Sequence, residues 1–307
     1  MFMNLNNFFD EDDQVKPGVM ILDTSTLMIA TISHTFKPED VVTEGMLRHL
    51  ILDTIRFNVL KFKNEYPEVI LAMDNSKMGY WRRDIAHYYK MNRKKKRDED
   101  VRDWEMIFGL IHKVTEELKE NMPYKVLDLQ KTEADDIIAV LSKKFTAEGR
   151  KVLLVASDGD YTQLHGLPGL RQWSPIEKSW KKCKHGSPYK DLMYKLIKGD
   201  AKDGVAGIKS RSDYIISKLD GERAPAITKK FLEEIYNAAD PVELLTEQEK
   251  ARYNENQMLI DFNFIPDYIS NPILKAYDEV QAAPRMKMYP YFVRSQLMKM
   301  IEKISDF

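Results

Sequence analysis

The sequence has little cysteine and no long apolar run. Among 307 residues there is one cysteine, Cys183, which excludes a disulfide within the chain and fits a reducing compartment. Apolar runs stay short of the eighteen residues that a transmembrane helix needs, so no membrane span is expected. The amino terminus lacks a basic start and turns acidic at Asp10, unlike a secretory signal peptide. We therefore expect a soluble intracellular protein.

The sequence also lacks net charge, although it is rich in charged residues. Lysine and arginine number 47, aspartate and glutamate 48, and the formal net charge is −1. Evenly mixed charges of this kind would argue against a nucleic-acid-binding protein. The hydrophobic content of 43% supports a folded core and excludes a largely disordered chain. The length favours two domains.

The charges are, however, unevenly distributed. Residues 82–97 carry +7 and residues 178–198 carry +6, which leaves about −14 on the rest of the chain. The first basic segment is interleaved with Tyr80, Trp81, Tyr88 and Tyr89. Cations that pair with phosphates, next to aromatic rings that stack on bases, are typical of a path for single-stranded nucleic acid. A solvated flexible loop is the alternative explanation for such a run.

Short apolar runs alternate with amphipathic stretches. The runs at 19–22, 69–73 and 152–156 are bounded by charged or polar residues and predict buried parallel strands, and 124–129 is a fourth candidate. Helices are expected around 47–59, with Thr43 as N-cap, and around 104–118. This order predicts an α/β fold with a mostly parallel sheet flanked by helices. We expect a tail at 1–18, an α/β domain at 19–190 with a basic segment at about 78–103, and a helical domain at 191–307.

Acidic residues follow the predicted strands. Because ligands of an open α/β sheet bind beyond the carboxyl ends of its strands, these acids are expected to converge on one cleft. Taken singly, each acid also has an explanation without function, because acids are favoured in the first turn of a helix and in tight turns. The candidate set is Asp23, Asp74, Glu133, Asp135, Asp136, Asp158, Asp160, Asp200 and Asp203, with the last two on one face if their turn is helical.

So many like charges in one cleft would need cations among them. Ligands that are all oxygen favour Mg²⁺ or Mn²⁺ over zinc, and the six histidines show no ligand spacing. Two such ions about 4 Å apart form the arrangement that supports in-line attack on a phosphodiester. The sequence therefore predicts a site for two magnesium ions, with Mn²⁺ as a substitute.

Two other functions fit parts of the sequence. Asp23 in Ile21–Leu27 faintly resembles the nucleophile motif of haloacid-dehalogenase phosphatases, but Ser25 stands where that motif has its general acid. That chemistry also leaves Glu133, Asp135 and the basic segment without a role. A non-catalytic nucleic-acid-binding replication factor is the third possibility.

The acidic motifs together resemble the flap-endonuclease, or 5′-nuclease, superfamily. The motifs are Glu133-Ala134-Asp135-Asp136, Ser157-Asp158-Gly159-Asp160 and Gly199-Asp200 with Asp203, preceded by Asp23 and Asp74. The residues Ala72–Asp84 and Leu259–Phe262 are most similar to the ribonuclease H branch of T-even bacteriophages, whose members do not have the RNase H fold. The resemblance extends over nearly the whole chain.

The resemblance implies a 5′→3′ exonuclease and flap endonuclease that acts on RNA–DNA and DNA–DNA duplexes and removes RNA primers during phage DNA replication, in the host cytoplasm. It implies one Mg²⁺ held by Asp23, Asp74, Glu133 and Asp135, and a second held by Asp158, Asp160 and Asp200, with Asp136 and Asp203 in support. Asp135 and Asp158 are then essential for catalysis. The segment 78–103 becomes an arch over the active site.

Nucleic-acid contacts follow from the same resemblance. Lys90 and Arg93 match positions expected at the scissile phosphate, and Tyr80, Trp81, Arg82, Arg83, Tyr89 and Lys94 complete the set in the basic segment. Lys209 and Arg211 are expected to bind duplex backbone. The glycine-rich hairpin of the superfamily is altered after Gly204, so a potassium site is not expected there.

Two protein partners are also expected. Leu5, Phe8 and Phe9 have the spacing of peptides that bind sliding clamps, although so short a segment also fits an unstructured or membrane-skimming end. The resemblance further implies cooperation with the single-strand DNA-binding protein of the replication fork through the carboxyl-terminal domain.

Overall fold

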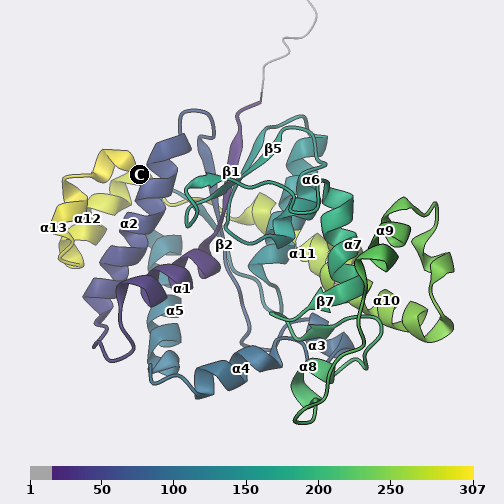
Figure 1. Ribbon diagram of the computed structural model, residues 1–307. Helices are drawn as coiled ribbons and strands as arrows, with labels where there is room; N and C mark the ends of the chain where they lie inside the picture. Colours follow the sequence, from purple (N-terminus) through teal and green to yellow (C-terminus); the bar gives the residue numbers. More distant parts are fainter. Residues whose placement is uncertain (1–15) are drawn as a thin grey trace, which may run out of the picture.

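A six-stranded sheet forms the centre of the molecule. The computed structural model describes residues 16–307, and its sheet has the order β3-β2-β1-β4-β5-β6 (Figure 1). The pairs from β3 to β5 are parallel and β5–β6 is antiparallel, which confirms the predicted sheet. The strands are β1 (Val19–Asp23), β2 (Glu68–Ala72), β3 (Lys125–Leu127), β4 (Val152–Val155), β5 (Leu170–Ser174) and β6 (Ser179–Trp180).

The central strands form because their residues are apolar on both faces. In β1 all five residues are buried, and Leu22 lies level with Leu71 of β2 and Val155 of β4. A parallel strand with helices on both sides needs such a continuous run. Strands β5 and β6 were not predicted, because polar residues such as Gln172 interrupt β5 and β6 has only two residues.

Helices cover one face of the sheet and include the carboxyl end of the chain. Met20 and Leu22 share a core with Leu47, Phe292 and Phe307. In α2 the Thr43 hydroxyl accepts a hydrogen bond from the backbone N–H of Met46, as predicted for its N-cap. The helices of this face are α1 (Thr24–Thr35), α2 (Glu44–Phe62), α5 (Trp104–Asn121), α12 (Met288–Arg294) and α13 (Met298–Ile301), and they gather on the left of Figure 1.

The other face of the sheet packs against helices α6 and α11. Ile21 and Leu154 from the sheet share a second core with Ile138 of α6 and Ile273 of α11. This second layer consists of α6 (Ala134–Ala147), the 3₁₀ helix η2 (Asp160–Leu164) and α11 (Asp267–Glu279). The carboxyl-terminal part of the chain therefore covers both faces of the sheet. The predicted boundary near residue 190 stays a prediction, but the last helices do not form a separate body.

A third core joins the basic segment to the region after residue 186. Tyr88 and Tyr89 pack there with Leu196, Val205 and Ile260. Two strands of two residues each occur in this region, where only helices were predicted. Its elements are α3 (Arg82–Ile85), α4 (Met91–Asp98), α7 (Pro188–Lys198), β7 (Gly199–Asp200), β8 (Val205–Ala206), α8 (Tyr214–Ser217), α9 (Lys229–Asn237) and α10 (Glu247–Ile260).

Short 3₁₀ helices connect the remaining elements. They are η3 (Pro241–Leu244), η4 (Phe262–Phe264), η5 (Arg285–Lys287) and η6 (Ile304–Asp306). Among residues 16–307, no helix is both long enough and apolar enough to cross a membrane. Leu5, Phe8 and Phe9, predicted to bind a sliding clamp, lie outside the described residues.

Candidate active site

Asp23 and Asp74 lie where adjacent strands end. Asp23 closes β1 and caps α1, because its Oδ1 accepts a hydrogen bond of 3.1 Å from the Thr26 N–H. The Asp74 N–H donates to Ser25 Oγ at 2.8 Å, and Asp74 Oδ1 accepts from the Ala134 N–H at 2.8 Å. The sheet order reverses between β1 and β4, the position where open α/β sheets bind ligands.

The acidic motif before α6 separates into different roles. Glu133 and Asp136 form a capping box at the helix start and both are fully buried. The Arg82 guanidinium lies 2.7 Å from Glu133 and 2.8 Å from Asp136, and the Trp81 Nε1–H donates to Asp136 at 3.0 Å. Asp136 is thus committed to the fold. The metal-supporting role predicted for it stays a prediction, since its carboxylate is held by these two side chains.

Two lysines hold Asp158, Asp160 and Asp200. The ammonium group of Lys195 lies between Asp160 and Asp200. This group is ion-paired with Asp160 and lies 2.7 Å from Asp200. Lys202 Nζ lies 3.4 Å from Asp158. Lys195 comes from α7 and Lys202 from the turn after β7. Their ion pairs therefore link the acids that follow β4, Asp158 and Asp160, to the second half of the chain.

Asp203 faces the basic segment rather than Asp200. It is ion-paired with Arg93, its Oδ2 lies 3.6 Å from Lys90 Nζ, and the Lys90 N–H donates to its carbonyl at 2.8 Å. Residues 200–203 form the turn of a hairpin between β7 and β8, in which the Asp203 N–H donates to the Asp200 carbonyl at 3.1 Å. Gly199 permits this hairpin: its φ is +80°, and a Cβ there would lie 2.3 Å from the Val205 oxygen.

The carboxylates converge as predicted from the strand ends. Asp135, Asp160, Asp200 and Asp203 line one small pocket. Asp23 joins this group through the Tyr161 hydroxyl, which contacts both Asp23 and Asp135. Glu133 joins it through Lys90, which is ion-paired with Glu133 and lies near Asp203. The assignment of individual carboxylates to metal ions stays a prediction.

Burial and mutual repulsion shift the pKa values of these acids. Burial and the neighbouring Asp74 raise the pKa of Asp23 to about 6. Burial and the charge of Asp158 raise the pKa of Asp160 to about 7. Burial opposes ionisation of Asp158 too, but the hydrogen bond from Asp160 and the charge of Lys202 outweigh it and lower the pKa of Asp158. A bound cation would relieve the repulsion between these acids that contributes to their raised pKa values.

The donor set fits divalent ions in number and kind. Six of the nine predicted carboxylates contact cationic side chains, which are five in number: Arg82, Lys90, Arg93, Lys195 and Lys202. Four negative charges are left over, which two divalent cations would balance. The acidic ligands offer oxygen alone, the donor that Mg²⁺ and Mn²⁺ prefer.

The structure corrects part of the predicted nucleic-acid contact set. Trp81 is 0% exposed and Arg82 2%, and both bind the acids at the start of α6. Neither can stack on a base or contact a phosphate in this conformation. Tyr89 and Lys90 are buried as well, with the Tyr89 hydroxyl 3.2 Å from Asp203. Their basic and aromatic character serves the carboxylate cluster, which the sequence pattern could not distinguish from a DNA-binding role.

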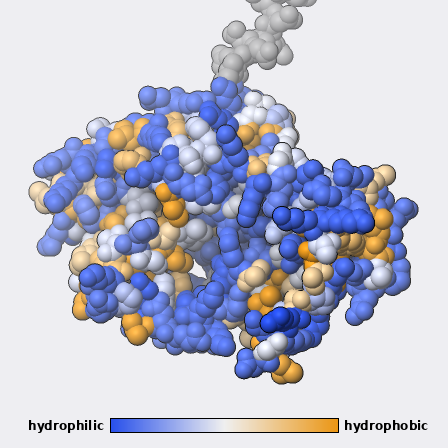
Figure 2. Space-filling view, viewed as in Figure 1, coloured by the Kyte–Doolittle hydropathy of each residue, from blue (hydrophilic) through white to orange (hydrophobic). Residues whose placement is uncertain are grey.

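Other members of the contact set remain accessible. Lys94 and Arg211 are exposed, although Arg211 is paired with Glu222, and Tyr80, Arg83, Arg93 and Lys209 are partly exposed. Hydrophilic residues dominate the lower edge of the molecule, where Figure 1 places α4 (Figure 2). Lys90 is the N-cap residue of α4 and has φ at +58°, which is uncommon for a lysine. Its contacts with Glu133 and Asp203 hold this conformation in place.

Three side chains that the sequence analysis did not assign belong to the site. Lys195 bridges Asp160 and Asp200, Tyr161 bridges Asp23 and Asp135, and Ser25 orients Asp74. Lys195 lies within the second basic segment and Tyr161 directly follows Asp160, so the sequence places both near the acidic motifs. Their contacts depend on the tertiary fold and could not be predicted from the sequence.

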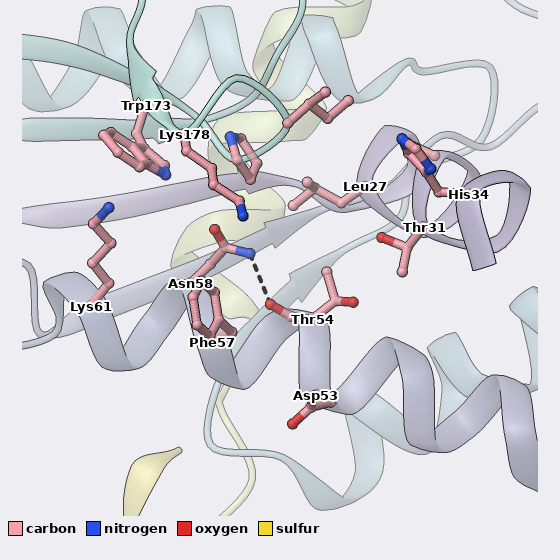
Figure 3. A pocket seen from close by; sticks show the side chains of 13 residues that line it. Leu27, Thr31, His34, Asp53, Thr54, Phe57, Asn58, Lys61, Trp173 and Lys178 are labelled. Atoms are coloured by element: carbon pink, nitrogen blue, oxygen red, sulfur yellow. Dashed lines mark hydrogen bonds between the residues drawn. The ribbon is translucent and has the colours of Figure 1, made fainter.

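Two other features of the structure lie apart from these carboxylates. A pocket of about 500 Å³ between α1, α2 and the β5–β6 turn contains Phe57, Lys61 and Trp173 (Figure 3). Its one carboxylate, Asp53, is paired with Arg56, so the pocket lacks the acidic chemistry of the site. His112, Glu116 and Asp128 lie close enough together to hold a metal ion, although the histidines show no ligand spacing in the sequence. Lys119 contacts both Glu116 and Asp128, and Lys77 contacts His112.

The fold and the carboxylate cluster define a nuclease of the 5′-3′ exonuclease class. The family described as "5'-3' exonuclease, N-terminal resolvase-like domain" matches residues 19–184, and "T4 RNase H, C terminal" matches residues 186–307. The chain belongs to this 5′-3′ exonuclease family. The haloacid-dehalogenase alternative is therefore wrong.

Individual relatives place the chain more narrowly. It is 47% identical to ribonuclease H of Enterobacteria phage T4 over 307 residues, covering 99% of this chain and 100% of that protein. A 5′-3′ exonuclease of Mycoplasmopsis pulmonis is 25% identical over 203 residues, covering 64% of this chain and 63% of that protein. The predicted resemblance is confirmed.

Solved structures of nucleases from bacteriophage T5 share the fold. T5 5′-exonuclease, solved with bound zinc ions, has a TM-score of 0.61 and 15% identity, covering 86% of this chain and 99% of the other. T5 flap endonuclease, solved with DNA and metal ions, has a TM-score of 0.60 and 16% identity, covering 85% and 100%. At this level of identity the likeness supports the fold alone.

Proposed function

We propose that this phage-type 5′-nuclease is a Mg²⁺-dependent 5′→3′ exonuclease and flap endonuclease for RNA–DNA and DNA–DNA duplexes. Its role would be to remove RNA primers from lagging-strand fragments in the host cytoplasm. The observation that carries the proposal is the cluster of nine carboxylates with only five cations, located at the reversal point of the sheet order. A 47% identical ribonuclease H over the full chain supports the same activity.

Two groups of acids would hold the ions. Asp23, Asp74, Glu133 and Asp135 form the first group, and Asp158, Asp160 and Asp200 form the second. Bound divalent ions supply an activated water and stabilise the leaving oxygen of the phosphodiester. Lys90 and Glu133 share an ion pair, so Lys90 becomes available to a phosphate only when Glu133 has another partner.

The remaining residues would orient the substrate. Arg93 is partly exposed and ion-paired with Asp203 of the β7–β8 turn, so it would contact the scissile phosphate. Lys94 on α4 would bind the backbone beyond it, and Lys209 with Arg211 would bind the duplex on the other side. Tyr80 is the aromatic residue of the segment that remains accessible enough to stack on a base.

The test replaces one acid in each group. Asp135→Asn and Asp158→Asn are each expected to abolish hydrolysis of a 5′-labelled primer–template while substrate binding persists, because each removes a negative ligand without removing a DNA contact. Lys275→Gln, an exposed change on α11, serves as control. Retained cleavage by both aspartate variants would refute two-metal catalysis. Loss of hydrolysis in both would exclude the non-catalytic binding factor.

Two protein partners complete the proposal. The segment containing Leu5, Phe8 and Phe9 would bind the sliding clamp, and the region after residue 190 would contact the single-strand DNA-binding protein. Deletion of residues 1–9 is expected to abolish stimulation by the clamp and to leave basal nuclease activity unchanged. Unchanged stimulation would show that the clamp binds elsewhere.

A further inference from the structure

Within residues 16–307, Tyr161 is the one uncharged side chain that joins two acids of the first group. It lies in η2, directly after Asp160, and is 0% exposed. Its ring belongs to the second core and packs against Phe262, with ring centroids 6.1 Å apart. A tyrosine buried this deeply needs a partner for its hydroxyl. The hydroxyl finds that partner among the carboxylates rather than in the core.

The hydroxyl contacts acids from two separate elements. Its oxygen lies 3.0 Å from Asp23 Oδ2, at the end of β1, and is hydrogen-bonded to Asp135 Oδ1, in the first turn of α6. Asp23 is then held at both oxygens, because Oδ1 accepts from the Thr26 N–H. One hydroxyl therefore fixes the spacing between a strand end and a helix start.

The second group of acids is held differently. Asp160 and Asp200 contact the ammonium group of Lys195, which orients them and also neutralises part of their charge. A tyrosine hydroxyl orients carboxylates and removes none of their negative charge. Asp23 and Asp135 are consequently ordered without a neutralising cation, whereas Glu133 of the same group is ion-paired with Lys90 and Arg82.

We propose that Tyr161 is a positioning residue that preorganises Asp23 and Asp135 for a divalent metal ion. The inference rests on the proposed function, in which these two acids share an ion. Outer hydrogen bonds to metal ligands set ligand orientation, and their loss commonly weakens metal affinity about 10- to 100-fold. The preorganised first group binds its ion more tightly than the lysine-bridged second group does.

The test is Mn²⁺ binding without DNA, followed by electron paramagnetic resonance. Tyr161→Phe keeps the ring and removes only the hydroxyl, and it is expected to raise the dissociation constant of the tighter site by about 10-fold. Tyr277→Phe is the matched control, because the Tyr277 hydroxyl also donates to a carboxylate, Glu68, at 2.7 Å, away from the site. Its Mn²⁺ affinity is expected to equal that of the wild type.

Kinetics give a second readout. At limiting Mg²⁺, Tyr161→Phe is expected to lower kcat with the KM for DNA unchanged, and excess Mg²⁺ is expected to restore kcat. Equal Mn²⁺ affinity in Tyr161→Phe and the wild type would overturn the inference while leaving the proposed function intact. If the melting temperature fell with that affinity unchanged, the role of Tyr161 would be structural only. No Mn²⁺ binding by the wild type would overturn both.

Discussion

At the scale of single residues, the site is a balance between carboxylates and the groups that hold them. Arg82 and Lys90 neutralise Glu133, Lys195 bridges Asp160 and Asp200, and Tyr161 orients without neutralising. The acids themselves could be predicted, because each follows an apolar strand or opens a helix. Their partners could not, since the pairing of residues as distant as Arg82 and Asp136 depends on how the elements pack.

The raised carboxyl pKa values predict how Mg²⁺ affects stability. Asp23 and Asp160 have pKa values of about 6 and about 7, above the ordinary value of 3.8. A raised carboxyl pKa gives stability that is fully present below the unfolded pKa and is lost as pH rises through the folded pKa. In the metal-free protein the stability that Asp23 and Asp160 contribute is therefore lost as pH rises to about 7, whereas bound Mg²⁺ favours their ionised forms.

Thermal unfolding with Mg²⁺ and with a chelator measures this effect. The increase in Tm caused by Mg²⁺ is expected to grow from about pH 5 to about pH 8, because more protons must be displaced from Asp23 and Asp160 at the lower pH. The same increase at both ends of this range would show that these carboxyls do not take part in metal binding.

Arg82 is predicted to serve the fold rather than the substrate. Arg82→Met leaves Glu133 and Asp136 buried near each other without their shared cation, which is expected to lower the free energy of unfolding by about 3–5 kcal/mol. Urea unfolding measures the loss. The neighbouring Arg83→Met, at a partly exposed side chain, is the control and is expected to change stability by less than about 0.5 kcal/mol. Equal stability of the two variants would refute the structural role.

At the scale of elements, α4 is the part of the basic segment that remains free to bind nucleic acid. Lys94, Lys95 and Lys96 are exposed on it, and α4 has no buried residues. The flanking α3 is instead bound to the carboxylate cluster through Arg82. From the sequence, residues 78–103 are predicted to form one unit, because cationic residues lie on both sides of Lys90, although the aromatic residues all precede it.

Neutralising α4 is expected to reduce the salt dependence of DNA binding. For duplex DNA, the slope of log affinity against log salt falls by about 0.9 for each phosphate contact removed. The triple change Lys94→Gln, Lys95→Gln and Lys96→Gln is therefore expected to flatten this slope in a fluorescence-anisotropy titration. The matched control neutralises three exposed lysines on the carboxyl-terminal elements, namely Lys275, Lys287 and Lys299. An equal effect of both triples would show that α4 has no special part in binding.

At the scale of the whole molecule, the first strand and the last residue of the described chain belong to the same core. Val19 begins the central strand, and Phe307 is 1% exposed in the core that contains Met20. The parallel sheet and the approximate position of its first strands could be predicted from apolar runs. The return of α11 and α12 to the sheet could not, because an amphipathic helix shows that it has an apolar face and not which surface covers it.

The carboxyl-terminal region also holds the two sets of acids together. Phe262 packs against Tyr161. Asn256 Nδ2 donates to the carbonyl of Leu196 in α7 and to that of Ala206 in β8. The acids from the sheet and those from the hairpin are thus held in one framework. The near-zero net charge of the chain is consistent with a nucleic-acid enzyme, because part of each basic segment is ion-paired with the acidic cluster while the lysines of α4 stay exposed.

The most direct measurement is cleavage of three 5′-labelled substrates, a 5′ flap, a nicked duplex and an RNA–DNA hybrid, as Mg²⁺ is titrated. The account predicts short products released from the 5′ end of each substrate, with no cleavage in a chelator and activity restored by Mg²⁺ or Mn²⁺. p-Nitrophenyl phosphate should remain intact. Cleavage that persists without divalent ions, or the absence of cleavage of all three substrates with Mg²⁺, would contradict the assignment of a two-metal 5′-nuclease.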